Sequence, residues 1–126
     1  IAPKSLTVSK EKQITWAEVA QIPLCLLTQN MKNRQLIDRH FLDLGISPSI
    51  VTEASDFTAV LAQVAAGNAA TIAPESVAQT FLDLKSTKQL DLIRPVLTHS
   101  VGLSIKDQSP VLPMIEALRK AVKSAL

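Results

Sequence analysis

The feature that most constrains the fold of this chain is a short apolar run followed by a helical pattern, a unit that occurs three times in succession. In the first unit, residues 24–27 form an uninterrupted apolar run between Pro23 and a polar loop. Such a run is too short for a helix and is typical of a strand covered on both faces. Apolar residues then recur at helical spacing up to Gly45, a residue type that favours helix ends. The first unit therefore predicts a strand followed by a helix.

The second and third units have the same organisation. Residues 49–53 are rich in β-branched side chains and predict a strand, Ser55 is a suitable N-cap for the next helix, and Gly67 marks its end. Residues 69–73 predict the third strand, with Pro74 at the first position of the following helix. Three such units predict an α/β fold with three layers, in which helices cover both faces of a parallel-type sheet.

The flanking segments carry weaker signals. Residues 1–13 are polar and lysine-rich and are expected to form an extended entry or linker. Thr15 and Glu18 have the spacing of a capping box, which predicts a short helix that begins at Trp16 and is stopped by Pro23.

Towards the C-terminus, two more strands and one helix are expected. Residues 90–97 predict a strand, and residues 101–106 alternate between apolar and polar, as in a strand covered on one face. Ser109 and Pro110 open a last helix with apolar residues at helical spacing.

Composition and charge narrow the class of protein. Aromatic residues make up only 3% of a chain that is 47% hydrophobic, so the core must be mainly aliphatic, as in α/β proteins. The 13 basic and 11 acidic residues form no long run of one sign, so we expect no polyanion-binding tail. No stretch approaches the roughly 18 consecutive apolar residues of a membrane span, so no membrane partner is expected. The single cysteine, Cys25, excludes an intramolecular disulfide and favours a reducing, cytoplasmic location.

A binding edge follows from the predicted sheet. The loops after parallel strands lie along one edge and bring helix N-termini with unpaired N–H groups there. In a functional interpretation, that edge binds a small carboxylate or another polar anion through hydrogen-bonding side chains. Those are Thr28, Gln29, Asn30, Arg34, Thr52 and Ser55. In the alternative interpretation, these side chains only cap helices, and the neighbouring carboxylates of Glu53 and Asp56 would repel an anion.

Catalytic signatures are missing from the sequence. It contains no GxGxxG, P-loop or nucleophile elbow. His40 and His99 are far apart in the predicted topology, and Cys25 lies in an apolar strand, where a thiol is normally inert. We therefore expect a binding module and not an enzyme, with no cofactor and no metal. The rival hypothesis of a small enzyme would have to use Glu53, Asp56 or Lys32.

Two stretches resemble a known family. Residues 14–20 (ITWAEVA) with 23–28 (PLCLLT) resemble the entry into the second subdomain of the effector-binding domain of LysR-type transcriptional regulators. Residues 65–75 (AAGNAATIAPE) are similar to that family's glycine-containing segment, although Ala69 stands where its second glycine is usual. The resemblance extends from Thr15 to Val122. It implies a fold like that of periplasmic binding proteins, with an effector held between two α/β subdomains.

The resemblance also implies which residues contact the effector. The family's pocket loops match eight residues of this chain: Thr28, Gln29, Asn30, Met31, Glu53, Ser55, Asp56 and Pro74. The expected ligand is a small polar metabolite. The family's dimer surface matches the helix that begins at Lys32 and ends at Leu44, and the strand that begins at Ser49 and ends at Glu53.

The same resemblance divides the chain into three parts: the entry at 1–13, the second effector-binding subdomain at 14–99, and a return strand with a C-terminal helix at 100–126. We expect DNA contact only through a domain that this chain lacks. The last part is expected to fold over the lobe or to associate with another chain, because it would otherwise expose apolar surface. The alternative class is one lobe of a periplasmic-type solute receptor.

Overall fold

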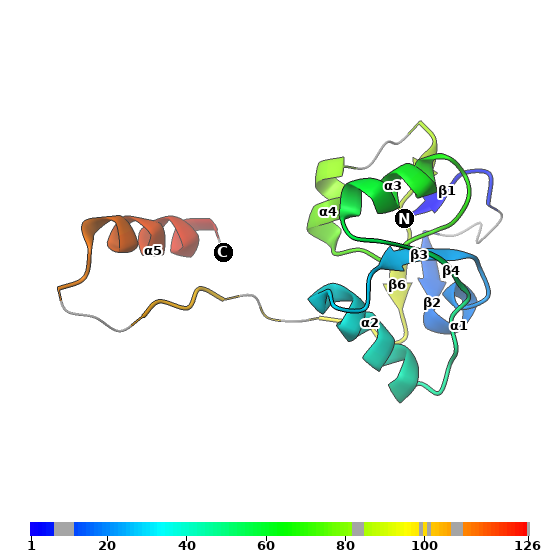
Figure 1. Ribbon diagram of the computed structural model, residues 1–126, viewed down its shortest axis with the longest axis horizontal. Helices are drawn as coiled ribbons and strands as arrows, with labels where there is room; N and C mark the ends of the chain where they lie inside the picture. The colour runs from blue at the N-terminus through cyan, green and yellow to red at the C-terminus, as the bar shows by residue number, and fades with distance from the viewer. Residues whose placement is uncertain (7–11, 82–84, 99, 101, 107–109, 126) are drawn as a thin grey trace.

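The computed structural model describes residues 1–6, 12–81, 85–98, 100, 102–106 and 110–125. Figure 1 shows a mixed lobe of helices and strands, and a C-terminal helix that stands apart from it. Along the chain, the described elements are β1 (Ala2–Pro3), β2 (Gln13–Thr15), α1 (Trp16–Val19), β3 (Leu24–Leu27), α2 (Lys32–Asp43), β4 (Ile50–Ala54), α3 (Phe57–Ala65), α4 (Glu75–Phe81), β5 (Thr87–Lys88), β6 (Asp91–Ile93) and α5 (Pro113–Ala125). Every candidate ligand-binding residue lies in the lobe.

The predicted parallel arrangement is confirmed at the centre of the lobe. Strands β3 and β4 pair in parallel, with Leu24 opposite Ile50 and Leu27 opposite Ala54. A parallel bridge between Leu24 and Ala70 brings the third unit to β3 as well. The starts of the three predicted units therefore lie side by side, as successive strand–helix connections require.

The third predicted strand, residues 69–73, is reduced to that single bridge. The Ala70 carbonyl accepts a hydrogen bond from the Cys25 N–H at 2.9 Å. At the next residue the partner changes, because the Thr71 N–H donates to the Ile1 carbonyl at 2.8 Å and the Ile1 nitrogen donates to the Thr71 carbonyl at 2.9 Å. The expected strand was too long because Thr71 pairs with Ile1 and leaves the ladder with β3.

Helices cover both faces of this sheet, which confirms the three layers. Successive side chains of a strand point to opposite faces. Leu24 and Leu26 belong to the core cluster that contains the buried residues of α2, whereas Cys25 and Leu27 belong to a second cluster with Val60 of α3. The uninterrupted apolar run is therefore explained by burial of β3 on both sides.

A second parallel pair lies beside the first. Strands β2 and β6 pair in register over three residues. The predicted capping box is confirmed: the Thr15 hydroxyl accepts from the Glu18 N–H at 3.3 Å, and the Glu18 carboxylate accepts from the Thr15 N–H at 2.8 Å. Trp16 is buried, and its indole N–H donates to the Pro95 carbonyl at 2.9 Å, which ties α1 to the segment after β6.

Strand β6 is shorter than the strand predicted over residues 90–97. It ends at Ile93 because Arg94 adopts a left-handed backbone conformation, with φ of 61°. Pro95 then has no N–H to continue a ladder. The strand therefore ends at a backbone conformation that the side chain of Arg94 does not predict.

The first residues of the chain are packed into the lobe. Ala2 and Pro3 are buried in β1, which pairs antiparallel with β5, so that Ala2 lies opposite Lys88. Residues 1–13 were expected to form an extended entry. Of these, Ala2 and Pro3 are extended, but they are paired with β5 and buried, so they belong to the packed lobe.

Two helix starts differ from the prediction. The N-cap of α3 is Asp56, whose Oδ1 accepts from the Ala59 N–H at 2.9 Å, so the expected Ser55 cap is wrong by one residue. Helix α4 begins at Glu75, and Pro74 directly precedes it instead of occupying its first position. A carboxylate reaches the N–H three residues on as well as a hydroxyl does, so both residue types at 55 and 56 were compatible with a cap.

The C-terminal region departs furthest from expectation. Residues 102–106 form no strand, although their alternating pattern predicts one, and Val101 lies outside the described residues. Helix α5 begins at Pro113 rather than at the expected Ser109–Pro110, of which Ser109 is also outside the described residues. An alternating segment becomes a strand only when another strand accepts its backbone hydrogen bonds, and residues 102–106 have none.

Candidate ligand-binding cavity

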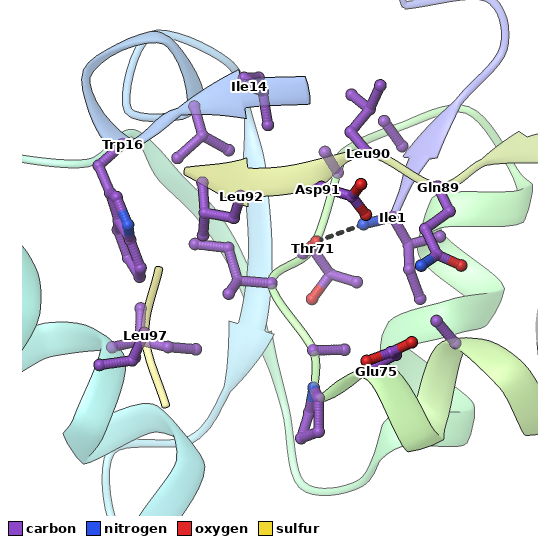
Figure 2. A pocket seen from close by; sticks show the side chains of 18 of the residues that line it. Ile1, Ile14, Trp16, Thr71, Glu75, Gln89, Leu90, Asp91, Leu92 and Leu97 are labelled. Carbon is purple, nitrogen blue, oxygen red and sulfur yellow. Dashed lines mark hydrogen bonds between the residues drawn. The ribbon is translucent and has the colours of Figure 1, made fainter. Parts of the chain in front are cut away.

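A cavity of about 590 Å³ opens beside the sheet of the lobe. It lies between β2 and β6 on one side and the segment from Ala70 to Glu75 on the other, with α2 contributing Asn33 and Leu36. Figure 2 shows these walls from close by. The volume falls within the roughly 300–1,000 Å³ of pockets that hold small ligands.

The two sides of the cavity differ in polarity. In Figure 2, Trp16, Leu92 and Leu97 face the space from one side, and Glu75 and Gln89 face it from the other. Asp91 also lines the cavity, and it lies beside Ile1 and above Thr71 in the view. The cavity is therefore able to accommodate a molecule with one apolar part and one polar part.

The position of Thr71 between the two sides follows from its backbone. Its two backbone hydrogen bonds with Ile1 hold the residue next to the start of the chain, and the side chain is only 3% exposed. The Thr71 hydroxyl has no hydrogen-bond partner among the described residues. A buried hydroxyl without a partner is costly in a folded protein, and a ligand or a water molecule normally satisfies it.

The charges around the cavity are acidic. Glu75 and Asp91 line it, and no lysine or arginine does so in the described part of the chain. The Glu75 carboxylate accepts from the Gln79 side-chain amide at 3.0 Å. The charged side chains that line the cavity, among the described residues, are therefore all acidic.

The predicted contact residues of the first two units meet at another edge of the lobe. The Thr28 N–H donates to the Ala54 carbonyl at 3.0 Å, which brings the loop after β3 to the end of β4. The Thr28 hydroxyl donates to the Asn30 side-chain oxygen at 2.7 Å. Gln29 and Ser55 are exposed at this edge. The sheet topology thus gathers these residues as predicted.

A buried arginine organises that edge. Arg34 is 3% exposed, and its Nη1 donates to the Leu27 carbonyl at 2.8 Å and to the Glu53 carboxylate at 2.6 Å. Its Nε donates to the Asp38 carboxylate at 2.7 Å. Arg34 and Glu53 therefore hold β3, α2 and β4 together, and their charges are already paired within the lobe.

Among the eight candidate ligand-binding residues, all of them described, Pro74 alone lines the cavity. The analysis of the sequence missed the polar residues that do line it: Thr71, Glu75, Gln89 and Asp91. Two signals were present. Thr71 is a hydroxyl residue inside an apolar run, and Asp91 is a charged residue between the apolar Leu90 and Leu92. Both lie inside predicted strands and not in the loops after them, where the ligand contacts were expected.

The described residues contain no group of three His, Cys, Asp or Glu side chains able to hold a metal ion. Cys25 is buried, and burial raises the pKa of its thiol, so it is a poor nucleophile. His40 packs against Trp16 with ring centroids 4.2 Å apart and the ring planes tilted by 58°, and His99 lies outside the described residues. None of the described helices is both long and apolar enough to span a lipid bilayer.

A layered α/β lobe with a cavity at its sheet is a ligand-binding type of domain. The comparison with protein families specifies the type: the LysR substrate binding domain matches residues 1–126. The chain belongs to this family. Its architecture is the periplasmic-binding-protein-like fold of LysR substrate-binding domains, with parallel strand pairs and helices.

A solved structure supports the same fold. The chain is similar to HinK, a LysR family transcriptional regulator from Pseudomonas aeruginosa, with a TM-score of 0.60 and 19% sequence identity. The match covers 79% of this chain and 34% of HinK, so the chain spans about a third of that regulator. The search among curated proteins gave no match.

Proposed function

We propose that this chain is the effector-sensing part of a cytoplasmic LysR-type transcriptional regulator and that it binds a small molecule without transforming it. The observation that carries the proposal is the cavity, whose polar and apolar sides and unpartnered Thr71 hydroxyl fit a bound ligand. Family membership supports this assignment. DNA binding and promoter choice belong to other parts of such a regulator.

Binding is able to affect structure because the cavity walls come from separate elements. Residues of the pair β2–β6 and of the segment before α4 belong to one core cluster, which includes Ile14 and Ala70. A ligand that contacts both walls stabilises the arrangement in which they are close. The size of this shift is set by the difference between the ligand's affinities for the close arrangement and for a more open one. The exposed side chains of Gln29, Asn30 and Ser55 provide further contacts for a ligand that reaches the neighbouring edge.

Assembly with a second copy uses α2 and β4. Strand β4 has β3 as its only described neighbour, so its other edge is unpaired. Val51 on β4 and Leu42 on α2 are 55% and 77% exposed. An open strand edge with exposed apolar side chains favours association with another chain. This surface includes most of the one that the resemblance implies.

The proposal is tested by a thermal-shift screen of small molecules against the full chain. We expect a saturable rise in Tm with at least one ligand. The variant Val96→Trp places a large ring at the cavity, where Val96 is 66% exposed, and is expected to abolish that rise. The matched control Val111→Trp makes the same change outside the cavity. Equal responses from the two variants would contradict the proposal.

A further inference from the structure

The charges at the cavity restrict which ligand it accepts. A ligand carboxylate would lie near Glu75 and Asp91 with no lysine or arginine at the cavity to offset the repulsion. An ammonium group would be attracted by both. Neither carboxylate takes part in an ion pair among the described residues. Their charge is therefore available to a ligand.

The Thr71 hydroxyl independently indicates a ligand with a hydrogen-bond donor. It lines the cavity at 3% exposure and has no partner among the described residues. A hydroxyl oxygen has two lone pairs and accepts from an ammonium N–H. Figure 2 places Thr71 between the apolar residue Leu97 and the acidic residue Glu75, where the polar end of a ligand would meet its apolar body.

The apolar wall defines the rest of the ligand. Leu92 and Leu97 line the cavity opposite the acidic side, together with Ile14 and Trp16. Burying methylene groups against this wall is favourable because it removes apolar surface from water. The ligand therefore needs an uncharged hydrocarbon part as well as its polar end.

We propose that the cavity selects a primary amine with an aliphatic or aromatic body, its ammonium group attracted to the side of the cavity that Asp91, Glu75 and Thr71 line. This inference rests on the proposed function and names the ligand class of the same site. It reverses the anion preference that the strand-end loops predict from the sequence alone. The reversal arises because the cavity lies beside acidic side chains of β6 and α4.

The test compares three probes with the same hydrocarbon chain: n-hexylamine, 1-hexanol and hexanoate. Isothermal titration calorimetry on the full chain at neutral pH measures each Kd. We expect hexylamine to bind on the order of tenfold more tightly than hexanoate, with hexanol between them. We also expect this preference to shrink as salt is raised, because the attraction at the partly open cavity is screened.

Variants assign the preference to the named residues. In Asp91→Asn with Glu75→Gln, hexylamine binding is expected to weaken about tenfold, while hexanol binding stays within about twofold. The retained hexanol binding shows that the variant is folded. Thr71→Val keeps the volume but removes the acceptor, and is expected to weaken hexylamine binding by roughly threefold to tenfold. Asp43→Asn removes one carboxylate from an exposed site outside the cavity and is the control for a change in overall charge.

The outcomes separate this inference from the proposed function. Hexanoate binding as tightly as hexylamine, or a preference unchanged in the double variant, overturns the ligand class while the cavity remains a binding site. If Asp43→Asn reduced the preference for hexylamine as much as the double variant does, the preference would come from overall charge, and the inference would also be overturned. If no probe binds and the screen with Val96→Trp gives no ligand-dependent difference, both proposals fall together.

Discussion

The lobe and the C-terminal helix have similar apolar patterns and opposite environments. In the lobe, α2 and α3 bury one face each against β3. In α5, Met114 and Leu118 are 75% and 50% exposed, although the helix carries an apolar stripe of the same kind. Helical periodicity is a local property, whereas burial depends on a partner surface brought close by the rest of the fold. A correct helix prediction therefore does not establish where the helix packs.

The connecting segments explain the difference. In the lobe, short loops return each helix to a strand that pairs with its predecessor, so packing follows from connectivity. Before α5, the described residues 102–106 form no strand, so they do not extend the sheet. The expectation that the last part folds over the lobe is wrong in this structure, and its association with another chain stays a prediction. Substitutions matched between the two regions measure how far their stabilities are independent.

The largest expected difference comes from the same substitution made in both regions. Leu26→Ala removes a side chain that is 1% exposed between two layers and is expected to lower the free energy of unfolding by about 2–5 kcal/mol. Leu118→Ala, at 50% exposure, is expected to change it by no more than about 0.5 kcal/mol. Urea denaturation followed by circular dichroism measures both. A loss at Leu118 close to that at Leu26 would show that α5 is packed in solution.

Two arginines give the next contrast. Arg34→Ala leaves the Leu27 carbonyl without this donor and Glu53 without its ion pair, which is expected to cost about 1–3 kcal/mol. Arg119 pairs with Glu116 at 3.6 Å on the exposed face of α5, and Arg119→Ala is expected to cost less than about 1 kcal/mol. Thermal unfolding of both variants measures the difference. Equal losses would mean that the buried network adds nothing to the lobe.

Helix caps provide a smaller effect. Asp56→Ala removes the side chain that accepts from the Ala59 N–H and is expected to destabilise the lobe by about 0.5–2 kcal/mol. Ser55→Ala next to it should have almost no effect, since Ser55 does not cap α3. Glu116→Ala removes an acidic side chain from the first turn of α5 and is expected to leave the unfolding of the lobe unchanged. A larger loss at Ser55 than at Asp56 would restore the cap expected from the sequence.

The smallest effect is a dependence on pH at α1. Hydrogen bonds from the Thr15 backbone and hydroxyl hold the pKa of Glu18 below its ordinary value of 4.5. Because the carboxylate is favoured in the folded state, its contribution is fully present above pH 4.5 and is lost as pH falls through the lowered pKa. Glu18→Gln should therefore reduce the difference in Tm between pH 6 and pH 3. Glu116→Gln on α5 is the control, and an equal change there would contradict the assignment.

Local patterns were sufficient for much of the lobe. The capping box of Thr15 and Glu18, the doubly buried β3 and the helix that ends before Gly67 were all predicted from short stretches of sequence. The predicted site was less complete. The loops after β3 and β4 do meet, but the cavity is lined by Thr71 and Asp91, which come from parts of the chain that no local pattern relates.

The sequence by itself determined the elements, because capping, periodicity and chain stiffness act over a few residues. It also determined the alternation that puts helices on both faces of β3. Only the tertiary structure decided that Thr71 pairs with Ile1, that Asp91 and Glu75 share one cavity, and that α5 stands apart from the lobe. These outcomes depend on contacts between residues that are distant in the chain. The free energy of each contact depends on the surfaces that the whole fold brings together.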